Sequence, residues 1–253
     1  MPAFPYLFYN TFFPVNIVTI AMMFVAGLIV IVLLRLGARN LDMRRPGRLQ
    51  NFIEWSVEFT AGMARDTMPS ERVVRFILPL AFTMLIFLFV SNWLGLIATI
   101  SVKLNEPVPW LGLTVARLAQ SHGEMPLFDS PTANMSMTLG LAFMVWLLSH
   151  AQGLRTPGRY FRHYLHNPMA IIEEITNPLT HGMRLFGNIF AGEALIGVLV
   201  GAPMLFGWIP LTLPLLLIWL FYSAFVSTIQ AYVFTILMTL YVGQKAYADN
   251  PHH

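Results

Sequence analysis

The sequence has no cysteine, and only 11% of its 253 residues are charged. The lack of cysteine excludes disulfides and thiolate metal sites, and it gives no reading of the redox compartment. Soluble domains carry about 25% charged residues, whereas 57% of this chain is hydrophobic. The composition therefore predicts a polytopic membrane protein, and the long uncharged runs described below make it an all-α one.

Motifs for nucleotide, metal and nucleic-acid chemistry are also missing. No Gly-rich loop ends in Lys-Ser or Lys-Thr, and no HExxH pattern occurs. His163 and His166 are three residues apart but have no third ligand at a useful spacing. The net charge of +3 comes mostly from arginines in short loops, which indicates membrane topology rather than nucleic-acid binding. We expect no cofactor, no metal and no nucleic-acid partner.

The N-terminal region predicts the orientation of the chain. Residues 1–16 carry no charged side chain and match neither a secretory signal nor a mitochondrial presequence. We expect a short external tail there and a bacterial plasma (inner) membrane as the location, with an organelle-encoded homologue as the alternative. Residues 15–36 contain about 20 apolar residues, enough for a first span. The positive-inside rule puts the following loop in the cytoplasm and the N-terminus outside. Its arginines are Arg35, Arg39, Arg44, Arg45 and Arg48.

The middle of the chain alternates surface and spanning segments. Residues 47–68 are amphipathic and too charged to cross a bilayer, which predicts a helix at the cytoplasmic interface. A docking helix for a soluble partner is the alternative. Residues 76–100 have no formal charge and form the second span, where Pro79 should bend or begin the helix. Residues 101–131 are an external loop with no assigned function, and residues 110–118 within it suggest a short helix.

The last part of the chain supplies three more spans. Residues 134–150 form a short third span, and residues 169–200 form a fourth that carries several charges. Residues 205–243 form the fifth, and as one helix it would be about 57 Å long. It must therefore tilt, break near Pro210 and Pro214, or cross twice. The charge pattern favours one crossing, with a cytoplasmic tail at residues 244–253, and gives about five spans in total.

The fourth span is unusual because its apolar sequence contains ionisable and amide side chains. Each charge near the bilayer centre costs a few kcal/mol, so intramembrane charges indicate ion paths by default. Arg184 has no acidic residue three or four positions away on the same helix. A partner on another helix or another protein is therefore expected, unless the charges pair within a purely structural helix. The polar side chains of this span are Glu173, Glu174, His181, Arg184, Asn188 and Glu193.

Helical geometry separates these groups. Arg184 and Asn188 lie on one face, whereas Glu193 points to the opposite side roughly 13 Å further along the axis. On the fifth span, Ser223, Gln230 and Tyr241 fall on nearly one face. A buried Gln230 amide needs partners, and Asn188 or Arg184 on the preceding helix are natural ones. Asn92 in the second span is expected to make an interhelical hydrogen bond.

These residues resemble a known family. The segment MRLFGNIFAGE, with IIEE before it and STIQAYVFTILMTLYV after it, is similar to subunit a of F-type ATP synthases. The same resemblance includes PGRLQNFIEW, SNWLGL and SPTANMSMTL, so it covers most of the chain. The N-terminal sixteen residues and residues 101–129 are the least diagnostic parts.

The resemblance implies a fold and a function that composition alone does not. It implies a hairpin of two long, strongly tilted C-terminal helices that lies across a rotating ring. The chain would be the stator half of the proton channel and not itself an enzyme. The implied partners are the c-ring subunits, b-type peripheral stalk subunits and the lipid bilayer.

The resemblance also implies roles for particular residues. Arg184 matches the essential arginine, and Glu193 matches the glutamate that lines the external half-channel. Ser223 stands where some relatives carry histidine, so a hydroxyl replaces any histidine relay there. Asn188 and Gln230 match polar positions near the arginine. The cytoplasmic half-channel would include Glu173, Glu174 and Tyr241, with the two glutamates partly redundant.

An arginine between two half-channels has a clear physical use. It stabilises the ionised form of a carboxylate that a partner subunit carries past, because an opposite charge within about 4–6 Å lowers a carboxylate pKa by roughly 1–3 units. It also blocks direct leakage, and it stays protonated where a lysine would not. The alternative is a secondary ion-coupled transporter, but the expected repeats of interrupted helices are not found. An intramembrane enzyme would need a nucleophile–base pair or metal set that the sequence lacks.

Overall fold

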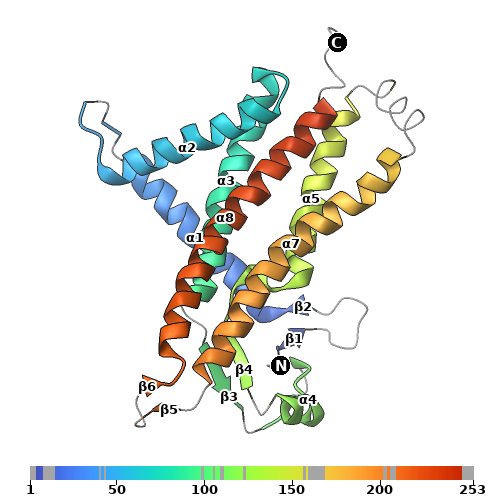
Figure 1. Ribbon diagram of the computed structural model, residues 1–253. Coiled ribbons are helices and arrows are strands. Elements are labelled where there is room, and N and C mark those ends of the chain that lie inside the picture. Colours follow the sequence, from blue (N-terminus) through green and yellow to red (C-terminus); the bar gives the residue numbers. More distant parts are fainter. Residues whose placement is uncertain are drawn as a thin grey trace.

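A computed structural model describes most of the chain and shows a bundle of long helices (Figure 1). The residues described are 4–7, 15–39, 41–42, 44–97, 100–104, 106–108, 111–121, 124–155, 158, 169–201, 204–205 and 209–246. Residues 35–48 and the C-terminus of the last helix mark one end of the bundle, called here the arginine end. The opposite end carries a strand hairpin near residues 100–128 and is called the hairpin end.

Helix α1 (Ile17–Ala38) corresponds to the expected first span. Asn16 caps its N-terminus, since the side chain accepts hydrogen bonds from the Val18 and Thr19 amides. Strands β1 (Tyr6–Leu7) and β2 (Val15–Asn16) pair just before the helix. Much of the expected external tail lies outside the described residues.

Helix α2 (Arg48–Thr67) corresponds to the amphipathic segment. Its buried face is formed by small and polar side chains such as Thr60 and Ala64, whereas Phe52, Trp55 and Phe59 stack along an exposed stripe. Helix α3 (Glu71–Ile97) follows. The expectation that Pro79 begins the helix is wrong, because α3 starts eight residues earlier and Pro79 lies inside it.

The segment between the second and third expected spans is more structured than a loop. Strands β3 (Ile100–Lys103) and β4 (Glu124–Phe128) form an antiparallel hairpin, and α4 (Val115–Gln120) lies between them. The expected short helix at residues 110–118 is therefore displaced toward the C-terminus. A 3-10 turn, η2 (Pro131–Ala133), leads from β4 into the next helix.

Three long helices complete the bundle. They are α5 (Met135–Gly153), α7 (Met169–Val200) and α8 (Leu213–Ala246). Helix α8 is one unbroken helix that begins after Pro210, so the expected run is interrupted near Pro210, as one alternative had it, and does not form two spanning helices. The start expected at residue 205 is wrong, because β5 (Met204–Leu205) and β6 (Ile209–Pro210) form a hairpin there.

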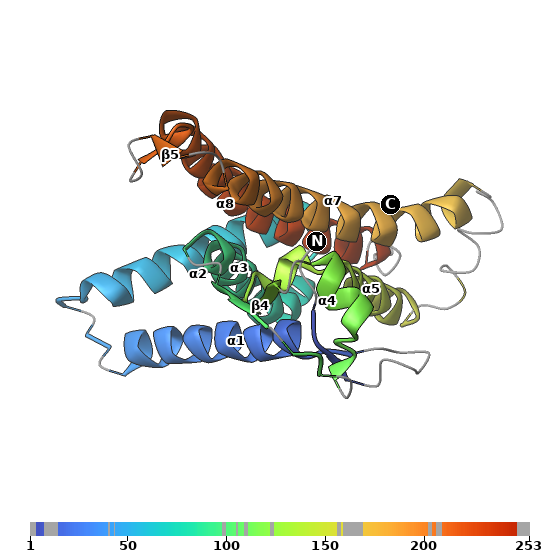
Figure 2. The same cartoon turned by 90° about the horizontal axis from the view of Figure 1, so that it is seen from below.

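The helices form layers, as the view from below shows (Figure 2). Helices α7 and α8 run side by side and antiparallel on one side, α1 lies on the other, and α3 and α5 lie between them. The core is apolar and includes Leu88 of α3, Val145 of α5, Leu185 of α7 and Phe234 of α8. This packing fixes one face of α7 and α8 against the bundle and leaves the other face outward.

Four of the described helices are long and apolar enough to cross a membrane: α1, α3, most of α7 and α8. Together with the helical bundle they confirm an all-α polytopic membrane protein. Helix α5 falls outside this set, so five spans, the orientation and the interfacial position of α2 stay predictions. Helix α8 has 34 residues and is about 51 Å long, which exceeds the roughly 30 Å hydrocarbon core.

Candidate functional site

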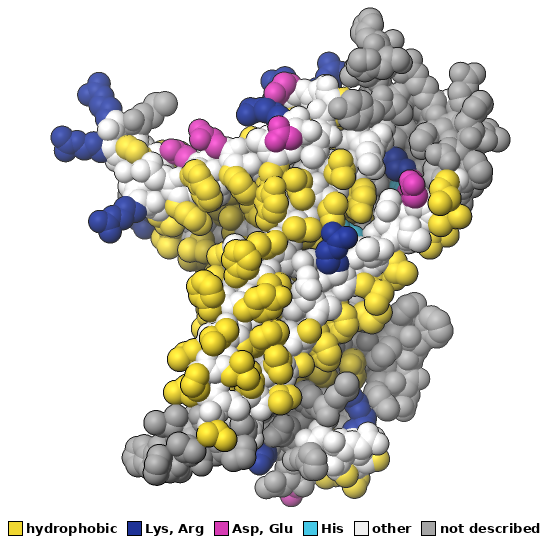
Figure 3. Space-filling model, viewed as in Figure 1, with side chains coloured by type: hydrophobic (Ala, Val, Ile, Leu, Met, Phe, Trp, Pro, Cys, Tyr) yellow, Lys and Arg dark blue, Asp and Glu magenta, His cyan; other side chains and the backbone are white. Residues whose placement is uncertain are grey.

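The outward face of α7 and α8 is a continuous apolar surface (Figure 3). Hydrophobic side chains cover both helices, and a basic side chain (dark blue) lies among them. Arg184 is exposed on α7, whereas the next residue, Leu185, is completely buried in the core. Exposed hydrophobic side chains of this surface include Leu179, Met183, Phe190, Phe221, Phe225 and Ile229.

The Arg184 guanidinium is not neutralised by the part of the chain that the structure describes. Neither a hydrogen bond nor an ion pair to it occurs among those residues. The sequence predicted a partner for Arg184 on another helix or on another protein. Since the described residues provide none, we expect the partner outside them. A cation on an apolar surface at membrane depth is costly unless a carboxylate or water reaches it.

Polar side chains of α7 and α8 meet one turn beyond Arg184. Asn188 Nδ2 donates a hydrogen bond of 2.8 Å to Gln230 Oε1, and Gln230 is only 3% exposed. This contact confirms the expected partnership of Asn188 with Gln230. Ser223 lies two turns away on α8 and is also buried, with a hydroxyl that makes no hydrogen bond within the described residues.

A cavity of about 110 Å³ opens between α3, α7 and α8 near these groups. One water needs about 10–15 Å³ of such volume, so several waters fit. The cavity is partly polar, and its unpaired Ser223 hydroxyl requires a hydrogen-bond partner. Its polar lining residues are Asn92, Asn188, Glu193, Ser223 and Ser227. The structure thus gathers Asn188, Glu193 and Ser223, three of the sequence-predicted residues, around one cavity.

Asn92 connects this cavity to the hairpin end. Its Nδ2 donates to the Ser227 carbonyl at 3.0 Å, and its Oδ1 accepts from the Thr132 hydroxyl at 2.8 Å. Ser130 continues the chain of contacts to Thr132 and to the Ser91 carbonyl. The expected interhelical hydrogen bond of Asn92 is confirmed.

Glu193 lies against the segment between β4 and η2. Its carboxyl group lies within hydrogen-bonding reach of the Asp129 carboxyl and of the Ser130 amide. Gly95 of α3 makes room for it, since a methyl group there would overlap Glu193 Oε1. Burial raises the pKa of Asp129, although hydrogen bonds from Glu193 and the Ser130 amide oppose the shift. Sequence reasoning missed Asp129, because only the folded loop brings it to Glu193.

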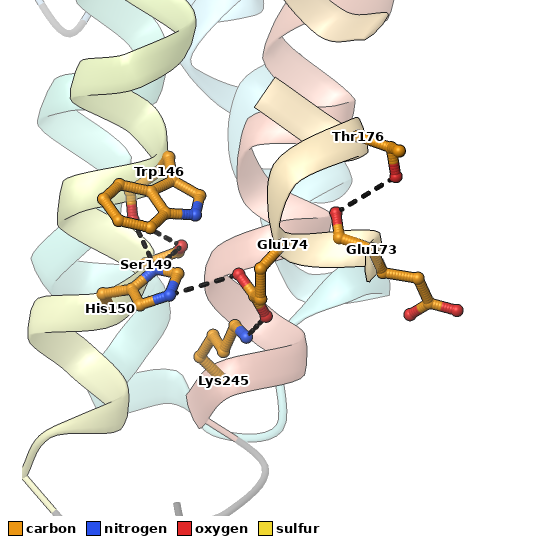
Figure 4. Close-up of polar contacts among 7 residues, drawn as sticks. All are labelled: Trp146, Ser149, His150, Glu173, Glu174, Thr176 and Lys245. Atoms are coloured by element: carbon orange, nitrogen blue, oxygen red, sulfur yellow. Dashed lines mark hydrogen bonds and ion pairs between the residues drawn. The ribbon is translucent and has the colours of Figure 1, made fainter. Parts of the chain in front are cut away.

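The two glutamates at the arginine end have different surroundings (Figure 4). Glu174 contacts the Lys245 ammonium of α8 and lies 3.2 Å from His150 Nε2 of α5, with about 18% of its side chain exposed. Glu173 is exposed and points away from this cluster. Glu174 therefore joins three helices, whereas Glu173 faces outward.

Tyr241 lies deeper along α8, on the side toward α7. Its ring meets the His181 ring edge-on with 5.7 Å between the ring centroids, and His181 also packs in a tilted arrangement against Phe234. Arg184 lies close enough to influence both His181 and Tyr241 electrostatically. The described residues contain no group of three or more potential metal ligands, and His163 and His166 lie outside them.

Fold and site together define a helical membrane protein with polar groups built into two long C-terminal helices. The profile of the family described as ATP synthase A chain matches residues 20–243. The chain is 38% identical to ATP synthase subunit a of Bacillus subtilis, over 93% of this chain and 94% of that one. It is 37% identical to the proteins of the same name from Oceanobacillus iheyensis (93% and 92% covered) and Enterococcus hirae (88% and 89%).

The chain belongs to the ATP synthase A chain family. It is a multi-pass membrane subunit of the ATP synthase, concerned with ion transport and ATP synthesis, and not the catalytic subunit. The family resemblance in the sequence is thereby confirmed.

Proposed function

We propose that this chain is the stator half of a proton channel, in which two offset half-channels meet at Arg184 and couple proton flow to rotation of a c-ring. The supporting observation is the exposed Arg184 on the apolar outer face of α7, without a counter-charge in the described chain. A passing ring carboxylate would supply that counter-charge. It would be ionised beside Arg184 and protonated where it faces lipid.

The external half-channel would run through the cavity at the hairpin end. Glu193, Ser223 and Asn188 line this cavity, and Gln230 holds Asn188 in place. Waters between these groups would carry protons toward the ring. Glu193 lies about 13 Å from Arg184 along α7, toward the hairpin end. The half-channel would therefore reach Arg184 from the hairpin end.

The cytoplasmic half-channel would open at the arginine end. Its residues would be Glu173, Glu174 and Tyr241, of which Glu173 faces the outer surface. The basic segment at residues 35–48 supports a cytoplasmic location for this end. The membrane would be a bacterial plasma membrane, and b-type peripheral stalk subunits would hold the chain against the turning ring.

The test is ATP-driven proton pumping by the assembled complex in proteoliposomes. Arg184→Ala should abolish pumping while the complex stays assembled, because the ring carboxylate loses the charge that favours its ionisation. Arg65→Ala is the matched control, since Arg65 is an exposed arginine paired only at the surface with Glu71. Pumping by Arg184→Ala at the wild-type rate would refute the proposal.

A further inference from the structure

Asp129 and Glu193 form a contact that the proposed half-channel does not yet use. Asp129 lies between β4 and η2, outside the spanning helices, and its carboxyl group hydrogen bonds to the Glu193 carboxyl. The Ser130 amide donates to Asp129 Oδ1 at 2.9 Å and also contacts Glu193. The Ser130 amide thus bonds to Asp129, and the Glu193 carboxyl and the Ser130 side chain both lie against Gly95.

A hydrogen bond between two carboxyl groups requires a proton on one of them. Ionised carboxylates only accept hydrogen bonds, and two of them in contact repel each other. Oε1 of Glu193 is buried and has no hydrogen-bond donor within the described residues. A proton shared between the two carboxyl groups supplies the donor that their contact needs. The pair therefore carries one proton and one negative charge.

The two carboxyl groups differ in their position relative to the cavity. Glu193 lines the cavity, whereas the described cavity lining does not include Asp129. Asp129 therefore contacts Glu193 from the loop side. Both are half-buried, and Gly95 leaves the Glu193 carboxyl room at the junction. A proton passing from the loop to the cavity meets Asp129 before Glu193.

We propose that Asp129 is the outer proton-relay residue of the external half-channel, taking protons from external water and passing them to Glu193 through the shared hydrogen bond. This inference rests on the proposed function. The relay conserves charge: the pair accepts a second proton at Asp129, and Glu193 releases one proton into the cavity water. The pair then returns to one proton and one negative charge, and the same steps run in reverse during pumping.

The experiment measures ATP synthesis driven by an imposed proton gradient, per assembled complex in proteoliposomes. Asp129→Asn should slow synthesis by roughly tenfold, less than the roughly 10²–10⁴-fold loss typical of a general acid or base because water carries part of the flow. Asparagine keeps the size and the hydrogen bonding, so assembly should be unchanged. Asp129→Glu should restore most of the rate, because it restores the carboxyl group. Glu106→Gln, an exposed carboxylate of the same loop region, is the control and should have no effect.

The double variant separates a relay from a structural contact. If protons pass from Asp129 to Glu193, Asp129→Asn combined with Glu193→Gln should be no slower than Glu193→Gln alone. If the rate loss of the double variant is instead the product of the two single losses, Asp129 and Glu193 act independently, and the relay is overturned. The relay is also overturned if Asp129→Asn synthesises ATP at the wild-type rate whereas Glu193→Gln is slow. That result would leave the proposed half-channel intact. Full speed in both single variants would contradict the external half-channel itself. A slow, fully assembled Asp129→Glu would also count against the relay.

Discussion

Glu174 should stabilise the helix bundle, whereas its neighbour Glu173 should not. Glu174 lies between Lys245 and His150, and all three side chains are only 15–18% exposed. Glu174→Gln removes the carboxylate and leaves the Lys245 ammonium without that partner. Glu173→Gln is the matched control, since it makes the same chemical change at an exposed adjacent position.

The size of the effect follows from burial. Breaking a fully buried ion pair costs about 3–5 kcal/mol, whereas exposed pairs contribute about 0–1 kcal/mol. The partial exposure of this cluster places the expected loss at roughly 2–3 kcal/mol. For a chain of this size that corresponds to a lowering of Tm by about 5–10 °C.

The assay is thermal unfolding of the detergent-solubilised complex, followed by loss of this subunit from the assembly. Glu174→Gln should lower the transition by that amount, and Glu173→Gln should leave it nearly unchanged, because water screens the charge of exposed Glu173 toward Lys245. Adding Lys245→Met to Glu174→Gln should recover part of the loss, because the buried cation is removed as well. Equal transition temperatures for the two single variants would refute the reasoning.

Two further substitutions test the packing around the site. Gly243→Ala should lower the yield of assembled complex, because the added methyl group would overlap the Thr67 carbonyl oxygen where α8 approaches α2. Gly62→Ala is the control, since a methyl group there meets nothing within 4 Å. Equal yields of the two variants would contradict the close approach of α8 to α2. Asn188→Leu should cost about 1–3 kcal/mol of stability, because buried Gln230 loses its hydrogen-bond donor. Thermal unfolding measures that loss, and an unchanged transition would mean that the Asn188–Gln230 bond contributes nothing.

The sequence predicted the helices because their signals are local. The uncharged runs and the amphipathic period of residues 47–68 can each be recognised within a single segment. The charged helix was predicted at residues 169–200 and observed with the same bounds. Helical period also puts Arg184 and Asn188 on one face, and both are exposed in the structure, but only the packing of the bundle shows that this face points outward.

The remaining features depend on contacts between distant segments. Asp129 reaches Glu193 only because β4 and η2 return the chain to α7, and no spacing in the sequence encodes that meeting. Glu173 and Glu174 are identical in chemistry, and the positions of Lys245 on α8 and His150 on α5 distinguish them. Helix α8 starts later than predicted, because β5 and β6 form a hairpin before it. Two prolines in an apolar run do not specify whether a helix bends or starts late.

The central claim is that Arg184 separates two half-channels at the boundary with the ring. The most direct test is passive proton permeability of proteoliposomes that contain the membrane sector, with wild type compared with Arg184→Ala. Without the fixed positive charge, protons should leak between the half-channels, so the variant should conduct measurably faster while its assembly is unchanged. A permeability equal to that of the wild type, together with normal ATP-driven pumping, would contradict the account and make the charges of α7 structural.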